Sequence, residues 1–401
     1  MPRMKGFLSA IVLLLCAAAA LSAADVTETA FMPMIPGVMG QGGASTATAT
    51  GWDSFFTNPA GFSREGGGFT VLETGAWMYA RPDRVVAMAQ EFITSGASAG
   101  LFSAINDEIT GGGFGIGASM GIAYAAKGLG LGMVIVTDSY FWGPTVLGVA
   151  GDVTATVGFM GGMSFPVQAG PMLIHIGGTL RPMVRIHTLL PNADALQMFL
   201  ALQAGKTLMT ALGPSYANAN AVYGVGVALD LGAIAELGWF TFGLSIRDVG
   251  GTVFNYSMDD FTTLVTVFGS ELRLPPGSTV TDRYVIPMDV SFGVAFHPMF
   301  GKFNKILDPT IHVDLTDMIG AIGGAVAGDS SIWKMVHIGA ELQLLSMLTA
   351  WAGLNQGYLT FGAGLDLFVV EINLSVFTRE LGHYLGDRPS SGLTLEVAIR
   401  I

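Results

Sequence analysis

The sequence has little cysteine and little charge, and each shortage excludes a class of function. Its single cysteine, Cys16, lies in an apolar stretch near the N-terminus. The rest of the chain can therefore form no disulfide, cysteine-ligated zinc site or thiol nucleophile. Charged residues make up 12% of the chain, about half the usual share, and the formal net charge is −12. Because the chain is acidic and has no basic cluster, we expect no nucleic-acid partner.

Catalytic and cofactor motifs are also missing. The six histidines form neither an HExxH motif nor another pair at metal-ligand spacing, and there is no GxSxG elbow. The letters GFGIGA, Gly113 to Ala118, fit a dinucleotide-binding fingerprint, but glycine at every second position produces such a match by chance. We therefore expect no enzymatic activity and no metal or cofactor.

The N-terminal residues predict a secretion signal over residues 1–24. Two positive residues precede the apolar residues 7–20, and small residues follow before Asp25. A permanent transmembrane helix is the alternative, but an apolar run of about 14 residues is shorter than the ~20 that span a bilayer. Cleavage would remove Cys16 and two positive charges, which takes the net charge from −12 to −14.

What the sequence has in quantity is a two-residue alternation. Between residues 113 and 124, large apolar side chains alternate with glycine, alanine and serine, and residues 393–401 show the same period with polar residues on the second face. Side chains two apart share a face of a strand. In a secreted chain this pattern is typical of a transmembrane barrel with its apolar face toward lipid. A soluble sandwich would expose more charges, and a helical membrane protein would need long charge-free runs.

The period predicts an all-β fold, a transmembrane antiparallel β-barrel of about 14 strands over residues 83–401 in a cell outer membrane. We expect a monomer in contact with outer-membrane lipid. Short and long gaps mostly alternate, as the two ends of such a barrel require, except for the short gap at residues 355–357. Residues 69–79 have strand character but stay outside the count. The expected strands are 84–94, 113–124, 127–139, 151–164, 170–187, 221–232, 237–249, 285–297, 308–316, 334–344, 347–354, 358–367, 369–378 and 391–401.

One long gap has a helical pattern. Asn192 can cap a helix over residues 192–212, and a Gly-Pro pair ends it. Apolar residues, Phe199 and Leu200 among them, recur at helical spacing. This helix either packs its apolar face on the rim of the barrel or offers a landing site for a hydrophobic ligand outside the pore.

The segment GVMGQGGASTATATGWDSFFTNPAGF, Gly37 to Phe62, resembles the N-terminal hatch of the FadL/TodX-type outer-membrane transporters of long-chain fatty acids and aromatic hydrocarbons. In that family a run of small residues leads into an Asn-Pro-Ala sequence soon after the signal. The resemblance implies a fourteen-stranded barrel with an N-terminal plug in the lumen and a helical third external loop. The chain departs from the family at its last residue, Ile401, where such barrels usually end in an aromatic residue that serves their assembly.

On this resemblance, residues 25–82 form the plug, or hatch. A lumen as wide as this one would leak solutes unless it were filled. A leader that lies outside the pore, before the first strand, is the alternative. The predicted gate residues are Trp52, Phe55, Phe56, Asn58, Pro59 and Ala60.

Positive side chains are predicted to face the lumen. Strand parity places cations on the inner faces of strands 170–187 and 237–249, and arginine holds carboxylates well in partly dry pockets. Alternatively, these cations pair with lumen acids and only fix the wall, although we expect Asp230 to lie too far along its strand to neutralise them. The predicted ligand-binding residues are Arg181, Arg185, His187, Arg247, Phe199 and Leu200.

These patterns lead to one functional hypothesis and two alternatives. The first is a passive outer-membrane channel for long-chain fatty acids or similar hydrophobic small molecules. The second is an outer-membrane scaffold that binds partner proteins through its loops and transports nothing. The third, a general porin for hydrophilic solutes, is disfavoured because the inner face carries few charges and a plug fills the lumen.

Overall fold

The structure is a computed structural model that describes residues 26–82, 108, 113–143, 150–190, 204, 220–271 and 273–401. Three predictions fall outside these residues. They are the secretion signal over 1–24, the strand at 84–94, and the helix at 192–212 with Phe199 and Leu200. The other expected strands are present within a few residues of their expected bounds. The expected strand 285–297 is interrupted, and a further strand over residues 252–260 lies where none was expected.

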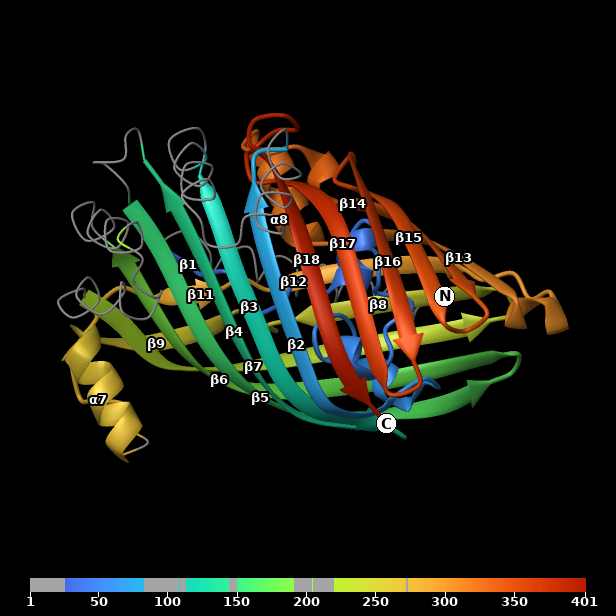
Figure 1. Ribbon diagram of the computed structural model, residues 1–401, viewed down its shortest axis with the longest axis horizontal. Helices are drawn as coiled ribbons and strands as arrows, with labels where there is room; N and C mark the ends of the chain where they lie inside the picture. The colour runs from blue at the N-terminus through green and yellow to red at the C-terminus, as the bar shows by residue number, and fades with distance from the viewer. Residues whose placement is uncertain are drawn as a thin grey trace, which may run out of the picture.

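The strands form one closed antiparallel barrel (Figure 1). Most wall strands pair with the next along the chain, and the ring closes where β18 (Pro389–Arg400) pairs with β2 (Gly68–Ala80). The other wall strands are β3 (Phe114–Ala126), β4 (Leu129–Trp142), β5 (Ala150–Ala169), β6 (Met172–Leu190), β7 (Asn220–Leu237), β8 (Phe240–Arg247), β9 (Thr252–Asp260), β11 (Tyr284–Ile286), β12 (Asp289–Phe296), β13 (Leu307–Leu315), β14 (Val336–Leu344), β15 (Leu348–Asn355), β16 (Tyr358–Leu367) and β17 (Val370–Glu380).

At two positions in this wall, two consecutive short strands take the place of one long strand, and we call each such pair a stave. β8 and β9 follow one another along β7, with a break at residues 248–251. β11 and β12 form the next stave in the same way, β11 on β9 and β12 on β8. Asp248 has a φ of 51°, and both following glycines at 250 and 251 also have positive φ, so the chain leaves the extended conformation there. With each stave counted as one strand, the wall has fourteen, as the alternation predicts.

The barrel begins earlier in the chain than the sequence predicts. The predicted plug extends to residue 82, but β2 is a wall strand that pairs with both β18 and β3. A bulge between Thr70 and Glu73 leaves the adjacent side chains of Val71 and Leu72 both exposed, which breaks the two-residue period. The wall therefore starts at Gly68, and the plug is shorter than predicted.

The predicted faces of the strands are confirmed. On β6, Ile176 and Leu180 are each 53% exposed, whereas Arg181 and Arg185 are 0% and 2% exposed. An apolar exterior around a polar interior is the arrangement of a transmembrane barrel, in which the outer side chains contact lipid. This is the architecture of outer-membrane proteins, so the fold places the chain in an outer membrane.

The two ends of the barrel differ in their connections. At one, the turn end, β3, β5, β7, β14 and β16 are each followed by two or three residues, and β12 by a longer connection with η4 (Gly301–Lys305). The other, the loop end, carries α7 (Phe261–Glu271), α8 (Met318–Ala327) and η5 (Ile332–Met335). Short turns at one end and long loops at the other match the prediction. Among the described residues, no helix is long and apolar enough to cross a membrane.

Neighbouring loops explain the one short connection at the loop end, between β15 and β16. Gln356 donates its backbone N–H to the carbonyl of Val336 (3.1 Å), and its side-chain oxygen accepts from the N–H of Glu380 (2.8 Å). The loops on both sides also meet, because Ser331 donates its N–H to the carbonyl of His383 (3.0 Å). The longer loops on both sides of the β15–β16 turn thus contact each other and the turn, so this end of the barrel is covered there although the turn is short.

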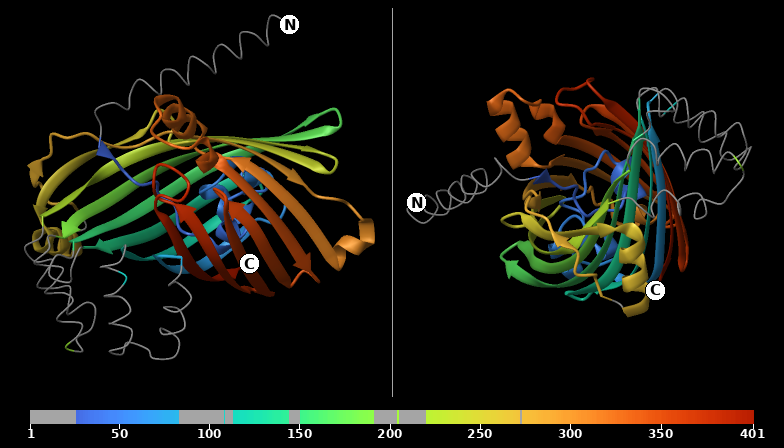
Figure 2. Two further views of the ribbon diagram at one scale, coloured as in Figure 1. Left: turned by 90° about the horizontal axis from the view of Figure 1, so that it is seen from above. Right: turned by 90° about the vertical axis from the view of Figure 1, so that its left-hand side faces the viewer.

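The segment before β2 lies inside the barrel (Figure 2). We call residues 28–67 the plug. It follows β1 (Val26–Thr27), a two-residue strand parallel to β11, and it contains short helices separated by turns. These helices contact several wall strands, from β3 to β18. They are α2 (Pro36–Gly40), η1 (Gly51–Phe55) and η2 (Pro59–Ser63).

The small residues on the inner face of the wall make room for the plug. A Cβ added to Gly232 would lie 2.0 Å from the side-chain oxygen of Asn58. A Cβ added to Gly130 would lie 2.5 Å from the ring of Phe62. Both distances are well below van der Waals contact. The glycine-rich parity of the strands therefore reflects packing against the plug.

Candidate functional site

The aromatic residues predicted to form a gate make up the core of the plug. Trp52, Phe55 and Phe56 are at most 4% exposed. The ring centroids of Trp52 and Phe56 lie 5.5 Å apart, those of Phe55 and Phe62 4.8 Å, and those of Phe31 and Phe56 6.1 Å. These separations fall within the range of favourable aromatic pairs. The rings thus join η1, η2 and the entering N-terminal segment into one unit.

Asn58, in the Asn-Pro-Ala sequence, attaches the plug to the wall. Its buried side-chain amide donates to the carbonyl of Thr46 (2.9 Å) and approaches one backbone carbonyl of β7 and one of β8 (3.3 and 3.2 Å). Its side-chain oxygen accepts from the N–H of Ala60 (3.1 Å) and so caps η2, which begins at Pro59. One side chain therefore shapes the turn and fixes it to two strands.

Further hydrogen bonds attach the plug around the lumen. The wall groups come from β8, β13, β16 and β18, so displacing the whole plug would break contacts on several sides. The bonds are Ser45 N–H and Thr46 N–H to the Asp314 carboxylate (2.8 and 2.7 Å), Thr360 hydroxyl to the Gly40 carbonyl (2.8 Å), Thr394 hydroxyl to the Met34 carbonyl (2.6 Å) and Ser245 hydroxyl to the Thr57 carbonyl (2.6 Å).

The predicted inward cations are already paired. Arg181 lies 3.2 Å from the carboxylate of Asp230 and 3.1 Å from that of Asp248. Arg185 lies 3.1 Å from the carboxylate of Glu28. The expectation that Asp230 lies too far away is wrong: β7 extends to residue 237, so Asp230 is in its middle and not at its end. Arg181 and Arg185 therefore pair with acids in the lumen, as the alternative interpretation of the sequence expected.

The remaining cations hold the start of the plug. His187 lies 3.3 Å from the Glu28 carboxylate, which also accepts from the hydroxyl of Tyr256 (3.0 Å). Arg247 donates to the carbonyl of Phe31 (3.2 Å). These contacts, with those of β1, fasten the entering chain to the wall. A direct ligand contact by any of these predicted cations stays a prediction.

A cavity of about 590 Å³ lies between the plug and the wall on the loop side. The plug contributes its first residues and α2, and the wall contributes β2, β4, β5, β6 and β17. Its polar side chains include Asp138, which accepts from the indole of Trp77 and the hydroxyl of Tyr79, both at 3.0 Å. The apolar lining consists of Ala30, Phe31, Met32, Pro33, Met34, Met39, Trp77, Tyr79, Val136, Tyr140 and Leu381.

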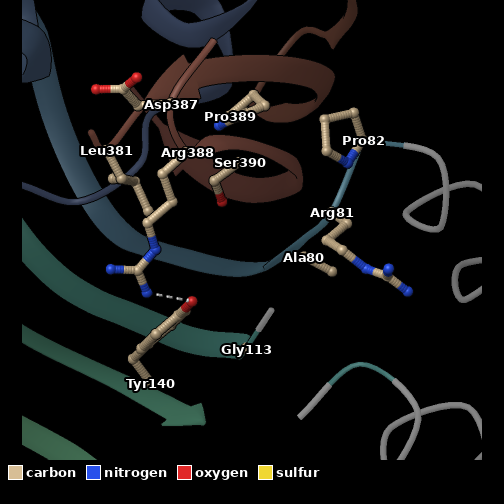
Figure 3. Close-up of a pocket in the computed structure, with 10 residues that line it drawn as sticks. All are labelled: Ala80, Arg81, Pro82, Gly113, Tyr140, Leu381, Asp387, Arg388, Pro389 and Ser390. Carbon is tan, nitrogen blue, oxygen red and sulfur yellow. Dashed lines mark hydrogen bonds between the residues drawn. The ribbon is translucent and has the colours of Figure 1, made fainter. Parts of the chain in front are cut away.

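Two arginines at this cavity differ from the predicted ones. The guanidinium of Arg379 lies 5.0 Å from the ring centre of Tyr79, and that of Arg388 lies 5.2 Å from the ring of Tyr140. The two rings stack on one another, with centroids 5.8 Å apart. Arg388 also donates to the Tyr140 hydroxyl (2.7 Å), at the edge of an adjoining pocket of about 280 Å³ (Figure 3). Within the described residues neither guanidinium forms an ion pair, although Arg379 interacts electrostatically with Asp138, which lines the same cavity.

A second, polar cavity of about 230 Å³ lies on the turn side of the plug. Met34 lines the larger cavity and Ile35 the smaller, so this part of the plug separates the two spaces. In the described part of the chain, no group of acidic and histidine side chains could hold a metal ion. The charged groups that line the smaller cavity are Asp53, Asp366, Glu371, Glu396 and Arg400.

Sequence reasoning missed Arg379 and Arg388 because of where the expected strands end. Arg379 lies one residue beyond the expected strand 369–378, and Arg388 lies in the gap that follows it. β17 in fact runs to Glu380. If the alternation of inward and outward residues in that strand is continued by two residues, it places Arg379 on the inner face. No local signal indicates the stacking of either arginine on a tyrosine from a distant strand.

No family model matches the sequence, and no curated protein sequence matches it. Several solved structures are similar to this one. They include the Pseudomonas putida toluene transporter TodX (13% identity, TM-score 0.46, covering 94% of this chain and 98% of that chain). The CymD monoaromatic hydrocarbon channel (11%, 0.46, 90% and 96%) and a Pseudomonas aeruginosa FadL homologue (11%, 0.45, 94% and 99%) are two others. The chain is thus similar in structure to proteins of the type that its N-terminal segment resembles in sequence.

Proposed function

We propose that the chain is a passive outer-membrane channel for hydrophobic small molecules, long-chain fatty acids foremost. The observation that carries this proposal is the cavity of about 590 Å³ in the lumen of a transmembrane barrel, lined by aromatic and methionine side chains. Ligand pockets of this kind are mostly apolar with a few placed polar groups. Methionine adapts to ligands of different shape, so the lining suits a hydrophobic chain or ring.

Arg379 and Arg388 are the groups that would hold a carboxylate. Each lines the cavity, stacks on a tyrosine ring and forms no ion pair within the described residues. A guanidinium binds a carboxylate through two parallel hydrogen bonds. A fatty acid would then place its head near the stacked tyrosines and its tail against Phe31 and Met34.

Passage beyond the cavity requires a movement of the plug. Met34 and Ile35 stand between the two cavities, and the carbonyl of Met34 accepts a hydrogen bond from Thr394 (2.6 Å). The bonds of Asn58 and Asp314 lie elsewhere in the plug. We infer that the segment around residues 33–37 moves while the aromatic core of the plug stays in place.

Uptake of labelled fatty acid into vesicles or cells that carry the protein tests the proposal. Faster uptake than in empty controls is the expected result, and it should saturate as the cavity fills. Uptake equal to that of the controls would contradict transport and favour a scaffold that binds partner proteins. A labelled sugar serves as the control solute, because a general porin would admit it and a plugged barrel would not.

A further inference from the structure

The connection between β12 and β13 differs from the other connections at the turn end. The others have two or three residues, whereas this one spans residues 297–306 and includes η4. In Figure 1 the segment extends beyond the neighbouring strands at the right of the barrel. It lines neither of the two lumen cavities. We call residues 298–306 the basic-aromatic turn.

The basic-aromatic turn exposes large apolar side chains beside positive charges. Met299, Phe300, Phe303 and Ile306 are each 52–53% exposed. Lys302 and Lys305 lie among them, also exposed, and neither forms an ion pair within the described residues. The whole sequence has only six lysines and a net charge of −12. Two lysines in one short, apolar connection are therefore a local concentration of positive charge.

Hydrogen bonds hold this turn in shape. The side-chain amide of Asn304 donates to the carbonyl of Pro298 (3.0 Å) and to the carboxylate of Asp308 (2.5 Å). Asp308 also lies 2.6 Å from His297, so this nearby acid is already engaged. The carbonyl of Ile306 accepts from the backbone of the next turn along the barrel (3.1 Å). The exposed apolar side chains thus project from a braced backbone.

The turn is continuous with the lipid-facing surface of the wall. Phe296 ends β12 and is paired across the strands with Ile311, which is 50% exposed. Trp239 and Phe240, in the neighbouring hairpin, lie 6.0 and 5.2 Å from the ring of Phe296. Aromatic girdles of this kind mark the level of the membrane interface on a β-barrel. The basic-aromatic turn starts directly at this girdle.

We propose that the basic-aromatic turn is an anchor for anionic phospholipid. Phe300 and Phe303 insert between lipids of the leaflet at the turn end, and Lys302 and Lys305 bind the phosphate groups of their heads. Lysines near a membrane surface attract anionic lipid, and aromatic side chains with basic neighbours are typical of interfacial segments. A protein partner could also cover an apolar patch, but continuity with the lipid-facing girdle favours lipid.

Site-specific labelling tests this anchor in the full barrel. Beyond Cys16 the chain has no cysteine, so Phe303→Cys provides a single attachment point for an environment-sensitive dye. Phe368→Cys is the matched control, because Phe368 lies in another turn at the same end, is 96% exposed and has no adjacent lysine. The labelled barrels are placed in vesicles of phosphatidylcholine, with or without phosphatidylglycerol. Access of aqueous iodide and quenching by brominated acyl chains are then measured.

We expect the dye at position 303 to be shielded from iodide and quenched by the brominated lipid. Phosphatidylglycerol should strengthen both effects. Changing Lys302→Gln and Lys305→Gln together should lower the enrichment of the anionic lipid around the barrel roughly tenfold, whereas the change of both to arginine should preserve it. The lysine changes should leave the control label unaffected.

Two results would overturn the proposal. One is a dye at position 303 that iodide reaches freely in both kinds of vesicle, which would place the turn in water or against a soluble protein partner. The other is shielding that depends on the number of barrels per vesicle, and not on phosphatidylglycerol or the lysines, which would indicate contact between two copies. Folding of the lysine variants is checked by heat-dependent migration on gels.

Discussion

Arg181 and Asp230 lie 3.2 Å apart on neighbouring strands, and both side chains are almost completely buried. Asp248, from the break between β8 and β9, lies 3.1 Å from the same guanidinium. One arginine thus joins β6, β7 and the interruption of the next stave. The pairing of inward arginines with lumen acids, which was the alternative interpretation of the sequence, therefore links neighbouring parts of the wall.

We expect substitutions of Arg181 and of Asp230 to lower the stability of the barrel by different amounts. Arg181→Met would leave two buried carboxylates facing each other without a cation, so we expect a loss of about 3–5 kcal/mol. Asp230→Asn leaves the arginine paired with Asp248 and should cost less, about 1–2 kcal/mol. Urea unfolding of the barrel in lipid, followed by tryptophan fluorescence, measures both. Arg64→Gln is the control, since its ion pair with Glu236 is partly exposed and should contribute under ~1 kcal/mol. Equal losses for all three would contradict a special role of the buried pair.

Gly232 lies so close to Asn58 that a methyl group added at position 232 should let ions leak through the barrel. Gly232→Ala places a Cβ 2.0 Å from the side-chain oxygen of Asn58, so the turn at Pro59 must shift away from the wall. We expect larger ion conductance in planar bilayers than for the unchanged barrel, as the seal between plug and wall opens. Gly161→Ala is the control, because its added Cβ meets only one lipid-facing leucine at 3.8 Å. Unchanged conductance in Gly232→Ala would show that the seal does not depend on this contact.

We expect the stability of α8, at the loop end, to depend on pH. The Asp317 side chain still reaches solvent, but partial desolvation by the surrounding loop, together with the nearby Asp289 carboxylate, raises the pKa of Asp317 to about 6. A carboxyl whose pKa is raised on folding is harder to ionise in the folded state, so its contribution to stability falls as pH rises from about 4 to 6 and then levels off. Asp317 also caps α8 by accepting from the N–H of Gly320 (3.2 Å).

The change that isolates this charge is Asp317→Asn. Asparagine can keep the cap and tolerates the left-handed φ of 46° at this position. We expect slower hydrogen exchange in α8 than in the unchanged chain at pH 8, and no difference at pH 4. The effect should be small because solvent reaches the Asp317 side chain and screens its charge. A benefit of the same size at both pH values would show that the charge is not responsible.

The sequence predicted the barrel well because lipid and lumen impose opposite demands on alternate residues. Ile176 and Arg181 satisfy those demands, so their strand was recognised and its faces assigned. Residues 69–79 have strand character but stay outside the predicted wall because fourteen other strands complete the expected count, and the bulge at Val71 and Leu72 interrupts the period there. β9 was missed because the expected strand ended at residue 249, at the turn before the two glycines, and the break between β11 and β12 was missed because the sequence predicts one strand over residues 285–297. Pairing across strands, as between Arg181 and Asp230, depends on register, which the period does not fix.

The remaining prediction separates the two sets of arginines in the binding of a fatty acid. Arg185 and Arg247 hold Glu28 and the carbonyl of Phe31, so changing both to alanine should loosen the start of the plug. Binding of a fatty acid and of the matching uncharged alcohol should then change by similar factors. The expectation from the sequence alone, in which these two arginines contact the carboxylate, would instead give a larger loss for the fatty acid than for the alcohol.

Arg379 and Arg388 should behave differently. Arg185 also lines the cavity but is paired with Glu28, whereas neither Arg379 nor Arg388 forms an ion pair within the described residues. Arg379→Ala with Arg388→Ala should weaken fatty-acid binding by about 1–3 kcal/mol, the value of a hydrogen bond to a charged group. The alcohol should bind almost as before, since its contacts are with the apolar lining. Titration of both ligands against the barrel in detergent, with tryptophan fluorescence as the readout, measures the difference. If acid and alcohol lose equally, these arginines support Tyr79 and Tyr140 and do not hold the ligand, and the carboxylate must be sought elsewhere in the lumen.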